Sequence, residues 1–296
     1  MGHTDRRRNA IAENPPEGAI LYYYLKEQPK DVIRLEILDS SGKAIRSYSS
    51  EEKKEDLARE EREREEPSDH IPAKTGLNLF TWDLRYQEPV KIPKAVYDEG
   101  SPLGPLVLPG KYDVRLTVAG KSTTLPVEVS LDPRVKTSSA DLQKQFDLML
   151  KLRDRQEELN KAILSIRDLR TQLLTLEKRL GAADHGKTDA NKSLIDQCAA
   201  LRKKISEVED ELINSKATAS EDELHYPTKL NSKFGYLTAA VDSADSAPTE
   251  GALGVFAELD GQLETQLAKW RDVTAKDLPA LNDALRSAGI PVVAPR

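Results

Sequence analysis

The sequence predicts an α+β protein in which a β-rich domain is followed by a helical domain. Nine of the 15 aromatic residues and twelve of the 17 prolines fall in residues 1–133, whereas residues 134–226 contain no proline at all. Strands punctuated by proline therefore come first, and a long helix-permissive stretch follows. Because strands and helices occur in separate runs, the pattern indicates separate domains and not an alternating α/β sheet.

Six segments of the first part have strand chemistry. The clearest is Val32–Leu38, in which Ile33, Leu35 and Ile37 alternate with charged residues, as in a half-buried strand. Turn sequences at 39–42 and 119–121 close two hairpins. Short strands joined in this way predict an Ig-like antiparallel β-sandwich. The expected strands are 19–25, 32–38, 43–49, 77–84, 112–118 and 122–131.

One segment does not fit the strand pattern. Residues 51–66 are charged at fourteen of sixteen positions, with Leu57 and Ala58 as the exceptions. Such a run has nothing to bury, so we expect a solvated insertion, either a helix with i,i+4 ion pairs or a disordered segment. A partner-binding segment is the alternative, and nothing in the run selects a partner.

The second part carries an apolar stripe that repeats every three or four residues. It predicts an antiparallel helical hairpin with a reversal at 181–186, followed by two shorter helices, so that four amphipathic helices form a bundle. Ser138 and Asp141 are a candidate N-terminal cap, and Pro279 bends or restarts the last helix. The stripe comprises Leu142, Phe146, Met149, Leu152, Leu159, Ile163, Ile166, Leu169, Leu173, Leu176 and Leu180, then Leu194, Cys198, Leu201, Ile205, Val208 and Leu212, then Leu230, Phe234, Leu237 and Val241, and finally Phe256, Leu259, Leu263, Leu267, Trp270, Leu281 and Leu285.

The sequence contains no recognisable pattern of catalytic, cofactor-binding or metal-binding residues. The four histidines, His3, His70, His185 and His225, have no second histidine or cysteine at helical spacing, and no glycine-rich phosphate loop or nucleophile elbow occurs. Cys198 lies on the apolar stripe, where it is expected to be a buried small hydrophobe and not a nucleophile. We therefore expect no enzyme activity and no cofactor.

The three consecutive tyrosines at 22–24 admit two interpretations. They could form a carbohydrate-stacking platform, but successive strand residues face opposite sides, so at most two share a face. Packing against the sandwich or a neighbouring domain is the preferred interpretation. Trp82 and Trp270 are expected to be core residues.

Composition narrows the classes of partner. The formal net charge of −6 argues against nucleic acid, and no apolar run approaches the length of a membrane span. A helix lying on a membrane is disfavoured because the polar faces carry mixed charge. The single cysteine cannot form an intrachain disulfide, and no apolar segment of a secretory signal follows Arg6–Arg8.

Three strings resemble the Ig-like domain of the flagellar hook-capping protein and its extracellular relatives. They are VIRLEILDSSGKAIRS at 32–47, GLNLFTWDLR at 76–85 and LPGKYDVRLTV at 108–118. The order of a strand, a D-x-x-G-K turn, a strand, G-x-N-x-x-x-W-D and P-G-x-Y is that of the family. The resemblance covers about 100 residues and implies a fold, not an activity. The charged run departs from it as an insertion.

A second resemblance spans nearly the whole chain. Residues 14–27, 131–135, 145–147 and 239–249 are similar to the C-terminal region of bacterial proteins with a sortilin-like, BNR-repeat β-propeller, often labelled glycosyl hydrolase or sialidase-like. In those proteins this region follows the propeller. The propeller repeat S-x-D-x-G-x-x-W is absent here, so no catalytic residue is implied in this chain. The resemblance implies export of full-length relatives, to the periplasm or outside the cell.

These observations predict three parts: a linker at 1–17, an Ig-like β-sandwich at 18–133 with a charged insertion at 51–75, and a helical hairpin or bundle at 134–296. The expected function is that of a non-catalytic accessory module whose partner is a protein, either a propeller domain or another chain. Two alternatives remain: a fragment of a sialidase-like hydrolase whose propeller is absent, and a freestanding coiled-coil adaptor. The sequence leaves the oligomeric state open.

Overall fold

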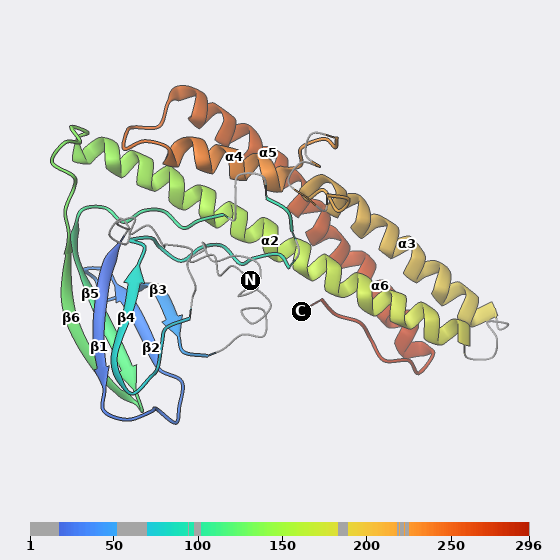
Figure 1. Cartoon of the computed structure of the whole chain (residues 1–296). Coiled ribbons are helices and arrows are strands. Elements are labelled where there is room, and N and C mark those ends of the chain that lie inside the picture. The colour runs from blue at the N-terminus through green and yellow to red at the C-terminus, as the bar shows by residue number, and fades with distance from the viewer. Residues whose placement is uncertain are drawn as a thin grey trace, which may run out of the picture. The chain divides into compact units, whose positions relative to one another are not determined.

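The fold is α+β, with antiparallel strands first and helices afterwards, as the sequence predicts (Figure 1). The computed structural model describes residues 18–51, 70–93, 95–97, 102–182, 189–217, 219, 222 and 225–295. The expected linker at 1–17 and nearly all of the charged run at 51–66 lie outside these residues. The contacts divide the chain into two compact units, which are treated separately below.

The strand unit contains two antiparallel sheets. β1 pairs with β4 in one, and the order of the other is β3-β2-β5-β6. All six strands fall on the segments that the sequence predicts, with ends that differ by at most two residues. Their bounds are β1 Ala19–Leu25, β2 Arg34–Leu38, β3 Ala44–Ser49, β4 Gly76–Trp82, β5 Gly110–Val118 and β6 Lys121–Val129.

Both predicted hairpin turns are present. Gly42 adopts a φ of 81° after β2, and its N–H donates to the backbone oxygen of Asp39 at 2.9 Å. Between β5 and β6, Ala119 and Gly120 have φ values of 48° and 75°. Two successive positive φ values make the tight hairpin turn that matches strand twist, and glycine adopts the second at little cost.

Aromatic contacts connect the two sheets of the strand unit. The rings of Trp82 and Tyr112 lie 5.8 Å apart edge to face, and those of Tyr48 and Phe80 lie 4.6 Å apart. Trp82 is fully buried, which confirms its prediction as a core residue, and its indole N–H donates to the Arg85 oxygen at 3.0 Å. Buried aliphatic residues complete this core: Leu25, Ile33, Leu35, Ile37, Leu38, Ile45 and Ile71.

The helical unit is built on one long helix. At about 1.5 Å per residue, the 44 residues of α2 span roughly 66 Å. The predicted cap at its start is confirmed, since the Asp141 N–H donates to the Ser138 hydroxyl at 3.1 Å. α2 packs against α3, α4 and α5, and α3 packs against α5 and α6. The bounds are α2 Ser139–Ala182, α3 Asp189–Leu212, α4 Leu230–Asp242, α5 Glu250–Asp272 and α6 Leu278–Ser287.

The core of the helical unit follows the predicted stripe with two corrections. Every stripe residue of α3 and α4 is buried, including Cys198. In the first turns of α2, however, Leu148 is buried and Phe146 is only half-buried. Phe256 and Trp270 on α5 are also only partly buried against the core. Each lies at the margin of a helix stripe, where the spacing alone does not distinguish the centre of an interface from its edge.

The last helix does not break at Pro279. It continues from α5 through a wider helical turn just before the proline. Residues Val273–Asp277 form one π-helical turn, η3, that joins α5 to α6. Proline cannot donate to the oxygen four residues earlier, here that of Ala275, and its ring clashes with that group. A wider turn moves the carbonyl away, so the helix continues with an altered register.

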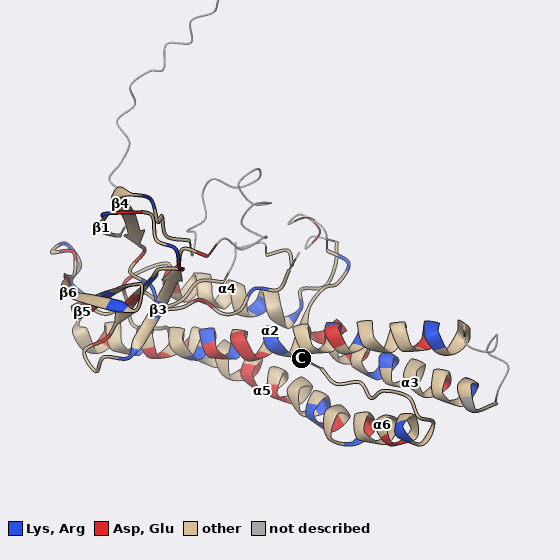
Figure 2. Ribbon diagram, turned by 90° about the horizontal axis from the view of Figure 1, so that it is seen from below, with Lys and Arg blue, Asp and Glu red and all other residues tan. Residues whose placement is uncertain are grey.

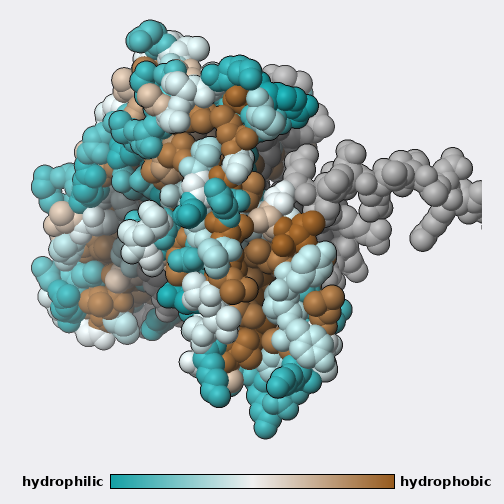
Figure 3. All heavy atoms as spheres, turned by 90° about the vertical axis from the view of Figure 1, so that its left-hand side faces the viewer, coloured by the Kyte–Doolittle hydropathy of each residue, from teal (hydrophilic) through white to brown (hydrophobic). Residues whose placement is uncertain are grey.

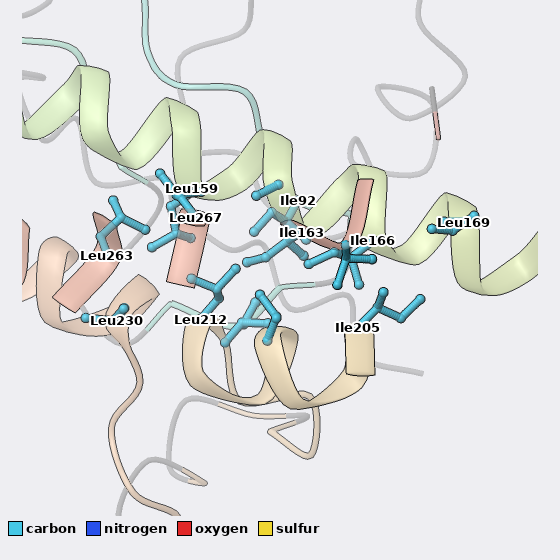
Figure 4. Packing of buried hydrophobic residues seen from close by; sticks show 14 of the residues in the cluster. Ile92, Leu159, Ile163, Ile166, Leu169, Ile205, Leu212, Leu230, Leu263 and Leu267 are labelled. Atoms are coloured by element: carbon cyan, nitrogen blue, oxygen red, sulfur yellow. The ribbon is translucent and has the colours of Figure 1, made fainter. Parts of the chain in front are cut away.

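Part of the segment between β4 and β5 belongs to the helical unit. Gln87–Leu108 group with Leu131–Arg296, whereas the strands up to Tyr86 and Pro109–Ser130 form the other unit. From the sequence, this segment is expected to be part of the β-sandwich domain at 18–133. Its buried residue Ile92 lies among α2 residues, beside Ile163 (Figure 4). The chain therefore passes from one unit to the other three times.

Candidate functional site

The most distinctive polar site of the helical unit is a buried amide cluster. It consists of Gln156 and Asn160 on α2 and Asn231 on α4, each at most 2% exposed. The Asn160 carbonyl oxygen accepts from the Gln156 amide at 2.9 Å and from the Asn231 amide at 3.1 Å. Asn160 in turn donates to the backbone oxygen of Val90 at 2.6 Å. The cluster thus holds the Gln87–Leu108 segment onto two helices.

The helical period explains why these amides meet. Gln156 and Asn160 are four residues apart, so they lie one turn above the other on the buried face of α2. Leu152, Leu159 and Ile163 continue the same face with apolar side chains. A polar group at such a position is costly unless it is bonded. The backbone of the Gln87–Leu108 segment supplies one acceptor.

Glu157 bonds the backbone N–H of Val90, the same residue whose backbone oxygen accepts from Asn160. The Val90 N–H donates to its carboxylate, and Lys161 forms an ion pair with it at 2.8 Å. Burial acts to raise the pKa of Glu157, but the hydrogen bonds from Lys161 and Val90 outweigh it, so this pKa lies below its ordinary value. Both backbone groups of Val90 are thereby bonded to α2.

Tyr97 completes the surroundings of the cluster. Burial raises the pKa of its hydroxyl. The Tyr97 hydroxyl, the Gln156 carbonyl oxygen and the Asn231 carbonyl oxygen are buried, and none has a hydrogen-bond partner among the described residues. The side-chain amides of Asn and Gln do not ionise near neutral pH, so the cluster is suited to holding a segment in place and not to acid–base chemistry.

A second buried polar group is an ion triad between α2 and α3. Glu209 is 1% exposed. It accepts from Arg167 at 2.7 Å and also pairs with Arg170. The two guanidinium groups are about a third exposed and keep contact with water, so the carboxylate is neutralised without complete burial of the cations. This arrangement fixes the register of α3 against α2.

Elsewhere on the helices, positively and negatively charged residues are interspersed, and several of them form ion pairs between helices. Figure 2 shows Lys and Arg interspersed with Asp and Glu along the helices. Arg155 pairs with Asp260 at 2.6 Å, which connects α2 to α5, and Arg202 pairs with Glu177 at 3.1 Å, which connects α3 to α2. Such pairs agree with the interpretation of these carboxylates as members of solvated helix faces.

The two histidines that the structure describes belong to different units. His70 is half-buried and forms a parallel bridge with Ser49, while His225 lies exposed in a turn. His3 and His185 lie outside the described residues. Within the described part of the chain, no group of three His, Cys, Asp or Glu side chains could hold a metal ion.

Cys198 is buried on α3, as expected for a residue on the apolar stripe. Burial raises the pKa of its thiol to about 11, with a smaller contribution from Glu177. A thiol with this pKa is almost entirely protonated at neutral pH. Since the thiolate is the nucleophilic form, Cys198 is chemically inert in the folded chain.

The tyrosines of β1 divide between the two faces of the sheet, as the strand period requires. Tyr23 is half-buried, and its hydroxyl donates to the Pro72 oxygen. Burial raises its pKa to about 12. Tyr22 and Tyr24 face outward and are 63% and 68% exposed. Packing within the strand unit, as predicted, is therefore confirmed for Tyr23 alone.

Sequence reasoning missed the amide cluster and Glu209, although a signal was present. The α2 stripe steps from Leu152 to Leu159, and Gln156 fills the gap at the spacing of the stripe. A polar residue at an apolar position of a long helix indicates a buried hydrogen bond. The backbone acceptor of the cluster, Val90, could not be predicted in this way because it lies 70 residues before Asn160, in an irregular segment.

No protein-family model, curated protein or solved structure matches the chain. Among the described helices, none combines the length and the apolar character that crossing a lipid bilayer requires.

Proposed function

We propose that the chain is a non-catalytic accessory module that serves as a structural and interaction region. In this proposal the two sheets form an Ig-like β-sandwich, and the helices form an antiparallel bundle. The module is the C-terminal part of a sortilin-like, BNR-propeller protein, exported with it, and its partner is a protein.

The proposal rests on one observation: the buried polar side chains named here bond other parts of the chain. In the helical unit, Asn160 bonds the Val90 backbone and Glu209 pairs with arginines. In the strand unit, Asn78 bonds the backbone at Lys74 and Gly76. A catalytic group needs a polar atom directed toward substrate at a suitable pKa. Here these groups hold peptide segments and helices in place instead.

Contacts between elements support the two architectures. The Trp82–Tyr112 and Tyr48–Phe80 ring contacts join residues of different sheets, as in a sandwich core. α2 packs against three other helices with side chains at steps of three and four, as in bundles. A crystal structure of the chain would test both, and sheets that do not pack face to face would contradict the sandwich.

The enzymatic alternative is tested by turnover. Purified chain should not hydrolyse aryl glycosides or sialosides above the level of a mock preparation carried through the same columns. Activity that follows the protein through purification and is abolished by one point mutation in it would overturn the proposal.

The nucleotide sequence upstream of Met1 tests whether the module follows a propeller domain in the full-length protein. The resemblance predicts propeller repeats in the reading frame upstream of Met1. A different upstream domain would remove the propeller as partner, and the turnover experiment would still decide whether the module is catalytic.

A further inference from the structure

The outward face of the β1–β4 sheet is apolar. β1 contributes Ile20, Tyr22 and Tyr24, and β4 contributes Leu77 and Leu79. These side chains are 39%, 63%, 68%, 70% and 48% exposed, in that order. In Figure 3, hydrophobic residues lie side by side on the surface in the lower part of the view, where Figure 1 has the strands.

The pairing of the strands makes this face continuous. Tyr22 lies opposite Leu79 and Tyr24 lies opposite Leu77. Directly opposed residues of an antiparallel pair have Cβ atoms about 5 Å apart, so each tyrosine lies beside a leucine on the same face. The remaining pair is Ile20 with Thr81. No member of these three outward pairs is charged.

The other sheet has the outward face that is usual for an antiparallel sheet. There Glu36 of β2 forms an ion pair with Arg115 of β5 at 2.9 Å, and Thr117 shares a hydrogen bond with Ser122 of β6. Polar residues outward and apolar residues inward are the normal alternation. The β1–β4 sheet is apolar on both faces, because Leu25, Phe80 and Trp82 face inward.

The size of the apolar face approaches that of a protein interface. At about 200 Å² per ring, the two tyrosines alone expose roughly 260 Å². Leu77, Leu79 and Ile20 extend the patch to the few hundred Å² of the largest apolar patches on monomeric proteins, which are often functional. A stable interface buries about 800 Å² on each partner around an apolar centre. This face has the area and composition of such a centre.

We propose that the chain forms a two-fold symmetric dimer through the outward face of the β1–β4 sheet. Each chain carries a formal net charge of −6, so two copies repel each other over most of their surfaces. The electrostatic free energy of association is least unfavourable where the two facing surfaces are uncharged. A second copy presents the same uncharged face, whereas a charged partner would lose hydration there without gaining an ion pair.

The strand register fits this symmetry. When two copies face each other across a two-fold axis parallel to the strands, β1 of each lies over β4 of the other. Tyr22 then packs on the partner's Leu79, and Tyr24 packs on the partner's Leu77. Each large flat ring meets an aliphatic side chain, and every contact occurs twice, as a closed symmetric interface requires.

Light scattering coupled to size-exclusion chromatography, with the whole chain at 1–100 µM, tests the dimer. We expect a mass of twice the 32.9 kDa of one chain at the upper concentrations. Leu77→Asp places a carboxylate on the partner's Tyr24 twice in each dimer, and we expect at least 100-fold weaker association. Tyr22→Ser removes a ring without adding charge and should weaken association at least tenfold.

Leu125→Asp is the matched control, because Leu125 is 65% exposed on β6 in the other sheet. This variant should dimerise as the unmodified chain does. Because the altered side chains are exposed, all three variants should retain the unmodified circular dichroism spectrum. Their melting temperatures should equal that of the unmodified chain at a concentration where every chain is monomeric, because association itself raises the melting temperature. A chain that stays monomeric at 100 µM would overturn the proposal. So would a dimer that folded Leu77→Asp and Tyr22→Ser variants leave intact, or one that Leu125→Asp disrupts.

The dimer is independent of the function proposed above. A monomeric chain without turnover would overturn only the dimer, and a dimeric chain with turnover would overturn only the non-catalytic role.

Discussion

The side-chain amide of Asn160 donates to the backbone oxygen of Val90 across 70 residues of sequence, at 2.6 Å. The same side chain accepts from Gln156 and Asn231. Three hydrogen bonds therefore converge on one buried residue, which joins an irregular segment to two helices.

Asn160→Ala should lower the free energy of unfolding of the helical unit by about 3 kcal/mol. The change removes these bonds and leaves polar groups buried without partners, at roughly 1–3 kcal/mol for each such group. Urea unfolding followed by circular dichroism at 222 nm measures the loss. The matched control is Gln143→Ala, which removes an exposed amide bonded to Asp147 on the same helix and should change the stability by less than about 0.5 kcal/mol. Equal effects of the two changes would contradict a buried cluster.

Glu209→Ala should destabilise the helical unit by about 2–3 kcal/mol. Removing one partner of a buried ion pair costs about 3–5 kcal/mol, and the partial exposure of Arg167 and Arg170 reduces that cost. Glu211 lies on the same helix, is 56% exposed and pairs with Lys229 at 3.4 Å. Glu211→Ala should therefore cost less than about 1 kcal/mol. The same urea titration compares them, and a Glu209→Ala variant as stable as Glu211→Ala would show that the triad contributes little.

Trp82→Ala should destabilise the strand unit by roughly 3–5 kcal/mol, because it leaves a large cavity beside Tyr112 and removes the hydrogen bond from the indole to the Arg85 oxygen. Calorimetry should show the transition of this unit at a lower temperature. Fluorescence of the remaining tryptophan, Trp270, reports the helical unit and serves as the internal control. An unchanged calorimetric trace would contradict the burial of Trp82.

Cys198 should resist thiol reagents in the folded chain and react after unfolding. Burial raises the pKa of its thiol to about 11 from an ordinary value of 9.0, so little thiolate forms below pH 9. The protonated thiol is favoured by folding, so its contribution to stability is complete below pH 9 and is lost as the pH rises toward 11. Labelling at pH 8, with and without 8 M urea, tests the reactivity. Rapid labelling without urea would contradict the buried position.

The elements of this fold were predictable to a large extent because each depends on local patterns. Alternation in β2 and the turn residues Asp39–Gly42 locate the first hairpin, and steps of three and four locate the long helices. Both signals report which side of one element is apolar. They do not report which other element covers it.

Contacts between distant irregular segments were not predictable for the same reason. Asn282 donates to the Val293 oxygen at 2.8 Å and accepts from the Val293 N–H at 2.9 Å, which holds the C-terminal tail on α6. Gln172 on α2 binds Ala294 in the same two-way manner. Asparagine and glutamine occur on many exposed helix faces, so their identity does not indicate which of them bind a backbone segment.

The three passages of the chain between its units have a consequence for dissecting the protein. A fragment that ends at Tyr86 lacks β5 and β6, and a fragment of residues 18–130 carries Ile92 away from the helices that bury it. A fragment that begins at Leu131 loses Val90 and leaves Asn160 without its acceptor. Neither unit can be excised by a single cut, so separating them requires Gln87–Leu108 to be replaced by a short loop in one fragment and supplied as a peptide to the other.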